Sequence, residues 1–199
     1  MSIEAIFWDM GGVIMRTDDQ TPRAKLAEQL GLSYADLANQ VFGSPESLRA
    51  QLGEITAQQF WEATSARYAM SPKDFIADFF RGDLIDQELV SAIRKLKANY
   101  KTGLLSNAFS DLRSWIRDEW KFGDAFSQMV ISAEVRIMKP DPAIYALAMK
   151  QLDVEPQSAV FVDDLHVNIE GAQEAGMHGI VFKSTVQTLG DLQALLGGN

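Results

Sequence analysis

The sequence predicts an α/β protein in which helices cover both faces of a parallel sheet and a small, all-helical segment is inserted after the first strand. Short apolar runs alternate with amphipathic segments of helix length along most of the chain, which is the pattern of parallel strands joined by crossover helices. One long stretch breaks this alternation with repeated helix-start signals. The length of 199 residues suits one core domain with a modest insertion.

The predicted strands are short and almost wholly apolar, as strands buried on both faces of a sheet are. They cover residues 5–8, 102–105, 129–131, 159–162 and 179–182. The amphipathic segments between and after them predict helices over residues 87–99, 111–120, 142–152, 168–175 and 188–196.

The predicted insertion contains a series of helix starts, each marked by a Ser or Thr in the N-cap position. These residues are Thr21, Ser33, Ser44, Thr56 and Ser71. Ligands of an open α/β sheet bind beyond the carboxyl ends of its strands, which is the edge that the insertion leaves. We therefore expect a cap domain over residues 17–84 and a core domain formed by residues 1–16 and 85–199. A helical decoration without a role at the site is the alternative.

Composition excludes several classes of function. The chain has no Cys and only two His, so a thiolate nucleophile and a zinc–thiolate site are impossible. Its net charge of −9 argues against a nucleic-acid partner, which requires a basic face. No apolar run is long enough to span a membrane, and the first residues lack the pattern of a signal peptide. We expect a cytoplasmic protein that acts on a small molecule and has no membrane partner.

Polar residues follow four of the predicted strands or the loops after them. The segments are 9–13 (Asp-Met-Gly-Gly-Val), 106–107 (Ser-Asn), 139–140 (Lys-Pro) and 163–164 (Asp-Asp). Each residue alone has an ordinary explanation as a turn or cap residue. Because parallel strands end on one edge of a sheet, however, all four segments are expected to converge there.

The converging residues suit phosphoryl transfer. The Asp9 carboxylate can act as a nucleophile and form an acyl phosphate. The two glycines after it let the backbone approach a ligand, and we assign Gly12 to substrate binding. Ser106 and Asn107 can donate hydrogen bonds to phosphoryl oxygens, and Lys139 is a compact cation for developing negative charge.

The charge at this edge predicts a metal cofactor. Asp9, Asp163 and Asp164 contribute −3 and Lys139 contributes +1, which leaves −2. An anionic phosphate would be repelled from such a site. A divalent cation neutralises it, and Mg²⁺ is the natural candidate because it prefers oxygen ligands and bridges carboxylates to phosphates.

In this order, the four segments resemble the four signature motifs of the haloacid dehalogenase (HAD) superfamily, and the insertion resembles that family's C1 cap. The resemblance covers the chain from Ile6 to about Val181. It implies a Rossmann-like core and a Mg²⁺-dependent phosphatase that works through an aspartyl-phosphate.

The resemblance also implies a role for each matching position. Asp9 would be the nucleophile and a metal ligand, and the carbonyl oxygen of Gly11 a second ligand. Asp164 would bind the metal directly and Asp163 through water, although the two could exchange roles. Asn168 would support these ligands or cap the following helix.

At the phosphoryl group, the resemblance implies that Ser106 binds the oxygens with Asn107 beside it, while Lys139 neutralises the oxygens and the nucleophile. Most phosphatases of the family carry a second aspartate two positions after the nucleophile, where this chain has Gly11. That aspartate protonates the leaving group, and general acid–base catalysis is worth roughly 10²–10⁴-fold. The departure predicts a bias toward substrates whose leaving group departs easily.

Candidates for the missing proton donor are water and three acidic residues near the cap, namely Asp18, Asp19 and Glu54. Bacterial α-D-glucose-1-phosphate phosphatase-like proteins resemble this chain in the first motif, in the cap segment 53–56 (Gly-Glu-Ile-Thr) and in the third motif at 136–140. The first expected substrate class is therefore a sugar phosphate, and within it a sugar 1-phosphate.

Other functions remain open from the sequence. A 2-haloacid dehalogenase needs no leaving-group acid, but it also needs no metal. Phosphonate cleavage would require a desolvated cap lysine, for which Lys25 and Lys73 are the candidates. A protein that binds a phosphometabolite without catalysis would explain Gly11, but not a carboxylate aimed at phosphorus.

Overall fold

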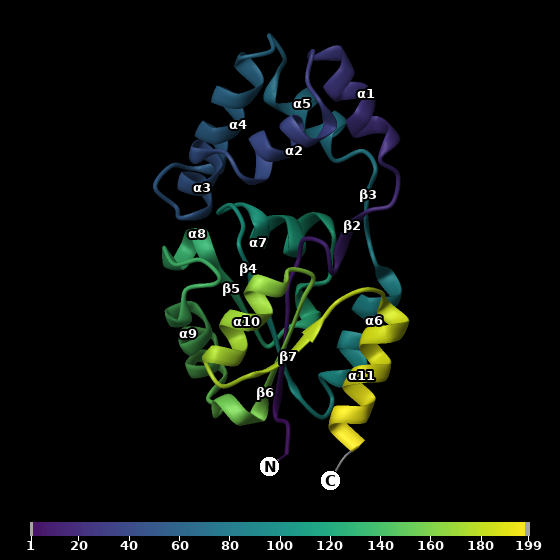
Figure 1. Cartoon of the computed structure of the whole chain (residues 1–199), viewed down its shortest axis with the longest axis vertical. Coiled ribbons are helices and arrows are strands. Elements are labelled where there is room, and N and C mark those ends of the chain that lie inside the picture. The colour runs from purple at the N-terminus through teal and green to yellow at the C-terminus, as the bar shows by residue number, and fades with distance from the viewer. Residues whose placement is uncertain (1, 198–199) are drawn as a thin grey trace.

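The computed structural model describes residues 2–197 and contains a five-stranded sheet with the strand order β5-β4-β1-β6-β7 (Figure 1). All neighbouring strands are parallel. Their bounds are β1 (Ala5–Trp8), β4 (Lys101–Ser106), β5 (Gln128–Ile131), β6 (Ala159–Asp163) and β7 (His178–Val181). The predicted α/β class and parallel sheet are confirmed.

The register of the central strands places the predicted site at one edge. Trp8 of β1 lies opposite Leu104 of β4 and Val162 of β6. The residues that follow in each chain segment therefore leave the sheet at nearly the same level. This alignment sets Asp9 beside Asp163, with Ser106 at the end of β4.

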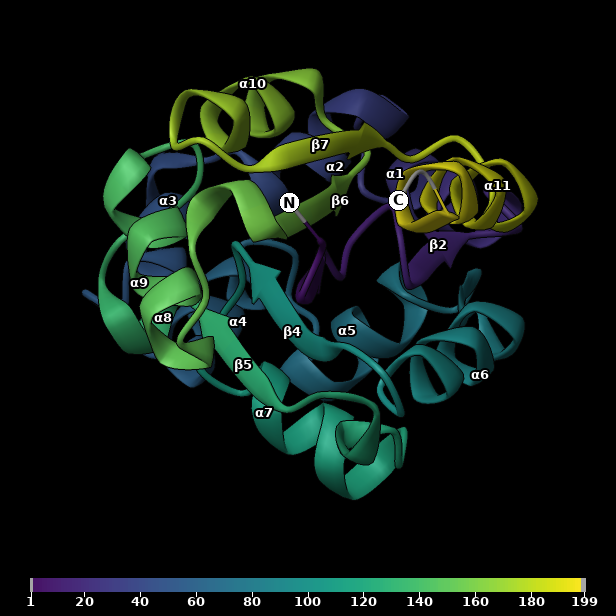
Figure 2. The ribbon, with the colours of Figure 1, turned by 90° about the horizontal axis from the view of Figure 1, so that it is seen from below.

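Helices cover both faces of the sheet (Figure 2). Alternate residues of β1 point to opposite faces: Ile6 and Trp8 join one hydrophobic cluster, and Ala5 and Phe7 join the other. Residues of α6 (Gln87–Leu96) and α11 (Thr185–Gly197) belong to the first cluster. Residues of α9 (Pro142–Leu152) and α10 (His166–Glu174) belong to the second.

The helix predicted over residues 111–120 is irregular. It consists of α7 (Leu112–Ser114) followed by a π-helical turn over Trp115–Glu119. The wider turn is closed by a bond from the Trp120 N–H to the Trp115 carbonyl, and the two indole rings lie 5.9 Å apart. The periodicity of apolar residues does not distinguish this geometry from a regular helix. A short helix, α8 (Ser132–Val135), follows β5.

Residues 17–84, which we call the insert, place five helices beyond the carboxyl ends of the strands (Figure 1). A two-stranded antiparallel ribbon of β2 (Met15–Thr17) and β3 (Asp83–Ile85) joins the insert to the rest of the chain. That ribbon was not predicted. The helices are α1 (Thr21–Gln29), α2 (Tyr34–Phe42), α3 (Pro45–Gln51), α4 (Ala57–Ala66) and α5 (Pro72–Phe79).

Four of the predicted N-caps have the expected hydrogen bond. The side chains of Ser33, Ser44, Thr56 and Ser71 each accept the backbone N–H three residues later. The prediction for Thr21 is wrong by one residue, because Thr21 already lies in α1 and its N–H donates to Asp19 Oδ1 at 2.8 Å. The Asp19 carboxylate, and not the Thr21 hydroxyl, therefore accepts a backbone N–H at the start of this helix.

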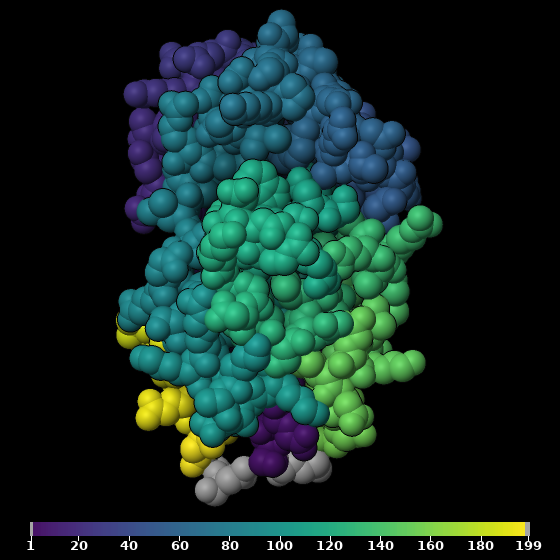
Figure 3. Space-filling view, turned by 180° about the vertical axis from the view of Figure 1, so that it is seen from behind, coloured from purple at the N-terminus to yellow at the C-terminus, as the bar shows by residue number. Residues whose placement is uncertain are grey.

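The insert has a hydrophobic core of its own, rich in aromatic rings that include Phe60, Trp61 and Phe75. Phe109, from the loop after β4, joins this cluster, with its ring centroid 4.7 Å from that of Phe60. The space-filling view from behind shows the segment after β4 rising against the insert (Figure 3). Because a ring of the sheet-bearing part completes the insert's core, the two parts are packed together.

A second contact joins α3 to α8. The Ser132 hydroxyl donates to the carbonyl oxygen of Gln51 at 2.6 Å. Nearby, a Cβ built on Gly53 would lie 2.2 Å from the carbonyl oxygen of Ala133, and Gly53 has a φ of +67°. Both the close approach and the left-handed backbone require glycine at this position.

We expect Gly53→Ala to destabilise the protein by about 2–4 kcal/mol, combining left-handed strain of about 1–2 kcal/mol with displacement of the Ala133 backbone. Urea unfolding measures the change. Gly31→Ala is the matched control, because Gly31 has a φ of +71° but nothing within 4 Å of its Cβ position. Equal losses for both variants would show that the contact with Ala133 contributes nothing.

Candidate active site

The ends of β1 and β6 and the loop before α9 bring three charged side chains together. The Lys139 ammonium lies 2.9 Å from Asp9 Oδ1 and 2.6 Å from Asp163 Oδ2. The Lys139 side chain is 1% exposed, and its ammonium lies 4.9 Å from the centroid of the Phe161 ring. Sequence reasoning treated a solvated lysine as the ordinary alternative, and the structure excludes it.

Asp163 accepts hydrogen bonds from three partners within the protein. Its Oδ1 accepts the Leu165 N–H at 2.8 Å, and the Asn168 amide lies 3.1 and 3.0 Å from its two oxygens. The ammonium of Lys139 donates to Oδ2 at 2.6 Å. Tyr145 supports this arrangement from α9, because its hydroxyl donates to the Asn168 carbonyl oxygen at 2.8 Å. Asp163 therefore holds the lysine and the start of α10 in place.

Asp164 turns the other way, toward the loop after β1. A Cβ built on Gly12 would lie 2.3 Å from Asp164 Oδ2, and Gly12 has a φ of +78°. Each of Asp9, Asp163 and Asp164 offers a carboxylate oxygen within 4.8 Å of the others. The close packing of Asp164 against Gly12 explains why this loop needs glycine.

This group has more negative charge than Lys139 can neutralise. Burial raises the pKa of Asp9 to about 6 against the opposing effect of Lys139, and the charge of Asp163 raises it further. Burial, followed by the charge of Asp163, also raises the pKa of Asp164. Buried carboxylates without enough counter-charge are costly. Three carboxylates in mutual reach are the donor set that a hard divalent cation prefers, so the residues present fit Mg²⁺.

The raised pKa of Asp9 predicts a pH-dependent stability. The folded protein binds the Asp9 proton more tightly than the unfolded chain does, so ionisation between pH 4 and pH 6 destabilises the metal-free fold. A rise of about 2 pKa units corresponds to about 3 kcal/mol. We expect metal-free Asp9→Asn to lack this loss. The unfolding free energy of the variant minus that of the native chain should therefore increase from pH 4 to pH 7. A constant difference in urea titrations would contradict the prediction.

Other predicted site residues are placed as follows. Ser106 is buried at the end of β4, and the Asn107 amide next to it bonds the backbone of Lys139 at 2.8 and 2.9 Å. Gly11 has open space around its Cβ position. Two candidate proton donors are engaged within the insert, since Glu54 pairs with Arg49 at 3.2 Å and Asp19 bonds Thr21.

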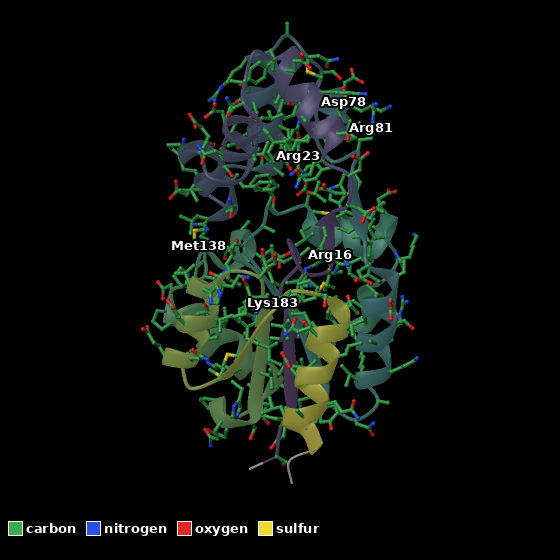
Figure 4. All side chains as sticks on the ribbon, turned by 45° about the vertical axis from the view of Figure 1, so that its right-hand side comes forward. Arg16, Arg23, Asp78, Arg81, Met138 and Lys183 are labelled. Carbon is green, nitrogen blue, oxygen red and sulfur yellow. The ribbon has the colours of Figure 1, made fainter. Side chains whose placement is uncertain are left out.

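Side chains surround the boundary between the insert and the sheet-bearing part (Figure 4). Arg16, Met138 and Lys183 lie on the lower side of this boundary, and Arg23 lies in the insert. Arg23 is buried and pairs with Asp83 at 2.8 Å.

The sequence predicted neither this ion pair nor the role of Tyr145. Neither carries a signal in one sequence, because a buried arginine and a tyrosine on an apolar helix face look like ordinary residues.

The profile of haloacid dehalogenase-like hydrolases matches residues 3–176 of the chain. The protein belongs to the haloacid dehalogenase-like hydrolase family. The predicted membership and the prediction of an enzyme of the hydrolase class are confirmed. The finer resemblance to glucose-1-phosphate phosphatases stays a prediction.

Two relatives illustrate the range of this HAD-like hydrolase's similarities. The "Phosphorylated carbohydrates phosphatase" of Thermotoga maritima is 27% identical over 98% of this chain and 90% of its own. The "Bifunctional epoxide hydrolase 2" of Sus scrofa is also 27% identical, over 99% of this chain, but the chain spans only 39% of that protein.

A solved structure shares the fold. The HAD family enzyme bt-2542 of Bacteroides thetaiotaomicron, in complex with magnesium and inorganic phosphate, is 23% identical, with a TM-score of 0.76 and coverage of 92% of this chain and 95% of the other. In the HAD-like hydrolase itself, none of the helices within residues 2–197 has the length and apolar character needed to cross a membrane.

Proposed function

We propose that this hydrolase is a Mg²⁺-dependent phosphatase that cleaves a small phosphate ester through an aspartyl-phosphate on Asp9. The observation that carries the proposal is the ammonium of Lys139, which lies 2.9 Å from Asp9 in a cluster of three carboxylates, two of them buried. Nucleophilic attack on a phosphoryl group requires a carboxylate and a neighbouring cation, and both lie here at the carboxyl ends of parallel strands.

In the first step, a carboxylate oxygen of Asp9 attacks phosphorus and the bond from phosphorus to the ester oxygen breaks. Asp9 is ionised for this attack at neutral pH, because its pKa is about 6. Lys139 stabilises the negative charge on the phosphoryl oxygens, and Ser106 donates a hydrogen bond to them. The departing oxygen takes its proton from water.

In the second step, water attacks the phosphorus of the acyl phosphate, inorganic phosphate leaves and the Asp9 carboxylate is restored. The buried position of Asp9, 7% exposed, keeps bulk water from the nucleophile. Gly12, whose backbone packs against Asp164, completes the wall of the substrate site.

We assign Mg²⁺ to Asp9, the carbonyl oxygen of Gly11 and Asp164, with Asp163 acting through water. Asp164 is the better candidate for direct ligation, because the Asp163 oxygens already accept hydrogen bonds from Lys139, Leu165 and Asn168. When bound, Mg²⁺ supplies Lewis-acid neutralisation of the phosphoryl oxygens. The magnesium and phosphate named in the Bacteroides structure support the choice of ion.

The substrate class follows from Gly11, because no side chain at this position can protonate the leaving group. A sugar 1-phosphate has an anomeric oxygen that leaves more easily than an ordinary alkoxide, and it is therefore our first choice. The carbohydrate phosphatase among the relatives supports a sugar phosphate. From the net charge of −9 we infer that the protein has no nucleic-acid partner. From the composition we infer a cytoplasmic location. We also propose that the insert, residues 17–84, is the cap domain of this site.

Phosphate release from a panel of esters tests the proposal. The panel contains sugar 1-phosphates, sugar 6-phosphates, an acyl phosphate and an aryl phosphate, each assayed with Mg²⁺ and with EDTA. We expect Mg²⁺-dependent release that favours the better leaving groups. Absence of release even from the aryl phosphate would refute the phosphatase. Halide release from 2-haloacids would then identify a dehalogenase, and phosphate binding without turnover would identify a binding protein.

A further inference from the structure

Lys139 lies in a loop that has no strand to hold it. The loop runs from α8 to α9, outside the sheet, so the N–H and C=O of Lys139 lack the partners that a strand residue would have. Buried backbone groups must nevertheless be paired. The position of this backbone matters because the Lys139 ammonium faces both Asp9 and Asp163 at hydrogen-bonding distance.

Both polar backbone groups of Lys139 are bound by one side chain. Asn107 Oδ1 accepts the Lys139 N–H at 2.8 Å, and Asn107 Nδ2 donates to the Lys139 carbonyl oxygen at 2.9 Å. A side-chain amide presents one acceptor and one donor side by side, which is the arrangement that a neighbouring strand would offer. An ionised carboxylate has no donor, and a hydroxyl has its donor and acceptor on one oxygen and not side by side.

The loop is held from the opposite side by α10. A Cβ built on Gly171 would lie 2.9 Å from the carbonyl oxygen of Pro140 and 3.0 Å from its Cβ. Pro140 therefore rests directly on the helix backbone. The Lys139 peptide is fixed between this helix and Asn107, which itself directly follows β4.

We propose that Asn107 is a positioning residue that fixes the backbone of Lys139, and that its side chain acts through this lysine rather than by contacting the phosphoryl group. The proposal rests on the proposed function, because it gives Lys139 its task. Loss of the amide releases the loop and lets the ammonium move away from Asp9. A displacement of about 1 Å in a catalytic group can cost roughly 10²-fold in rate.

A double-mutant cycle tests how Asn107 acts. We expect Asn107→Ala to lower kcat for the aryl phosphate by about 10–100-fold, with little change in KM. In the Lys139→Met background, the same change is expected to cost less than about 2-fold, because the group that it positions is gone. Asn107→Asp, which keeps the acceptor and loses the donor, is expected to fall between. Equal factors in both backgrounds would overturn the proposal. Asn99→Ala, at an exposed position, is the matched control.

A second measurement does not depend on activity. Acylation with an amine-reactive reagent, mapped by mass spectrometry, reports access to each lysine. Lys139 is expected to react slowly in the native chain and about 10-fold or more faster in Asn107→Ala, through local opening of its loop. The exposed Lys150 is expected to react equally in both.

The two results separate two failures. Unchanged acylation of Lys139 would overturn the positioning role even if the protein is a phosphatase. Conversely, a native chain that releases no phosphate would refute the proposed function, while the acylation result would still decide whether Asn107 holds Lys139.

Discussion

Asp9→Asn is expected to abolish phosphate release, with a loss on the order of 10⁴-fold or more, as for removal of other enzymatic nucleophiles. The amide has the shape of the carboxylate but cannot form an acyl phosphate. The variant should fold, because Lys139 keeps its 2.6 Å contact with Asp163. Steady-state turnover of the aryl phosphate with Mg²⁺ measures the effect.

Phosphate binding shows whether the variant that lost turnover still has its phosphate site. Asp9→Asn removes one negative charge beside Lys139, so a variant that still binds Mg²⁺ should bind inorganic phosphate more strongly than the native chain. Calorimetry in the presence of Mg²⁺ measures this affinity. Asp191→Asn, an exposed position on α11, controls for the general loss of an aspartate. Retention of turnover by Asp9→Asn would show that another group attacks phosphorus.

Gly11→Asp is expected to raise kcat/KM for substrates with poor leaving groups, such as sugar 6-phosphates, by roughly 10²–10⁴-fold. The position can accept a side chain, since nothing lies within 4 Å of the Cβ site and its backbone is not left-handed. The carboxyl group would restore a proton donor two residues after the nucleophile. Aryl phosphates, whose leaving group needs little protonation, should gain much less.

The dependence of the rate on the leaving group's pKa measures this gain. Gly11→Asn is the matched control, because it fills the same space without an ionisable proton. Equal effects of the two substitutions would mean that packing, and not proton transfer, is responsible. Gly12 offers a contrast, because a Cβ there would lie 2.3 Å from Asp164 Oδ2, so Gly12→Ala should lose activity.

Much of the fold and the convergence of the site could be predicted from the sequence. The apolar run before Asp9 and the one before Asp163 become adjacent strands whose residues leave the sheet at one level. The alternation of short apolar runs with helices predicts that both strands end on one edge of a parallel sheet, although it does not predict that they are neighbours. Four of the five N-caps predicted in the insert were also correct, because Ser and Thr strongly prefer the position just before a helix.

Contacts between distant segments could not be predicted in this way. The bonds from Asn107 to Lys139 join residues that are 32 positions apart, and no local pattern marks either partner. The pairing of Arg23 with Asp83 likewise spans 60 positions. Such contacts depend on the conformations of the loops around the sheet. A single sequence gives the types of the two residues but not which of them are in contact.

The contribution of Phe109 to the aromatic core of the insert has a consequence for the timing of catalysis. If the insert is the cap that we propose, its opening would separate Phe109 from Phe60 and Trp61 and bring the Phe109 ring into water. Exposing a large apolar side chain costs about 1.5–3 kcal/mol, so open molecules should be a small minority. The rate of such opening would set an upper limit on turnover if product leaves by this route, and the fluorescence of Trp61, whose ring centroid lies 5.5 Å from that of Phe109, would report each opening.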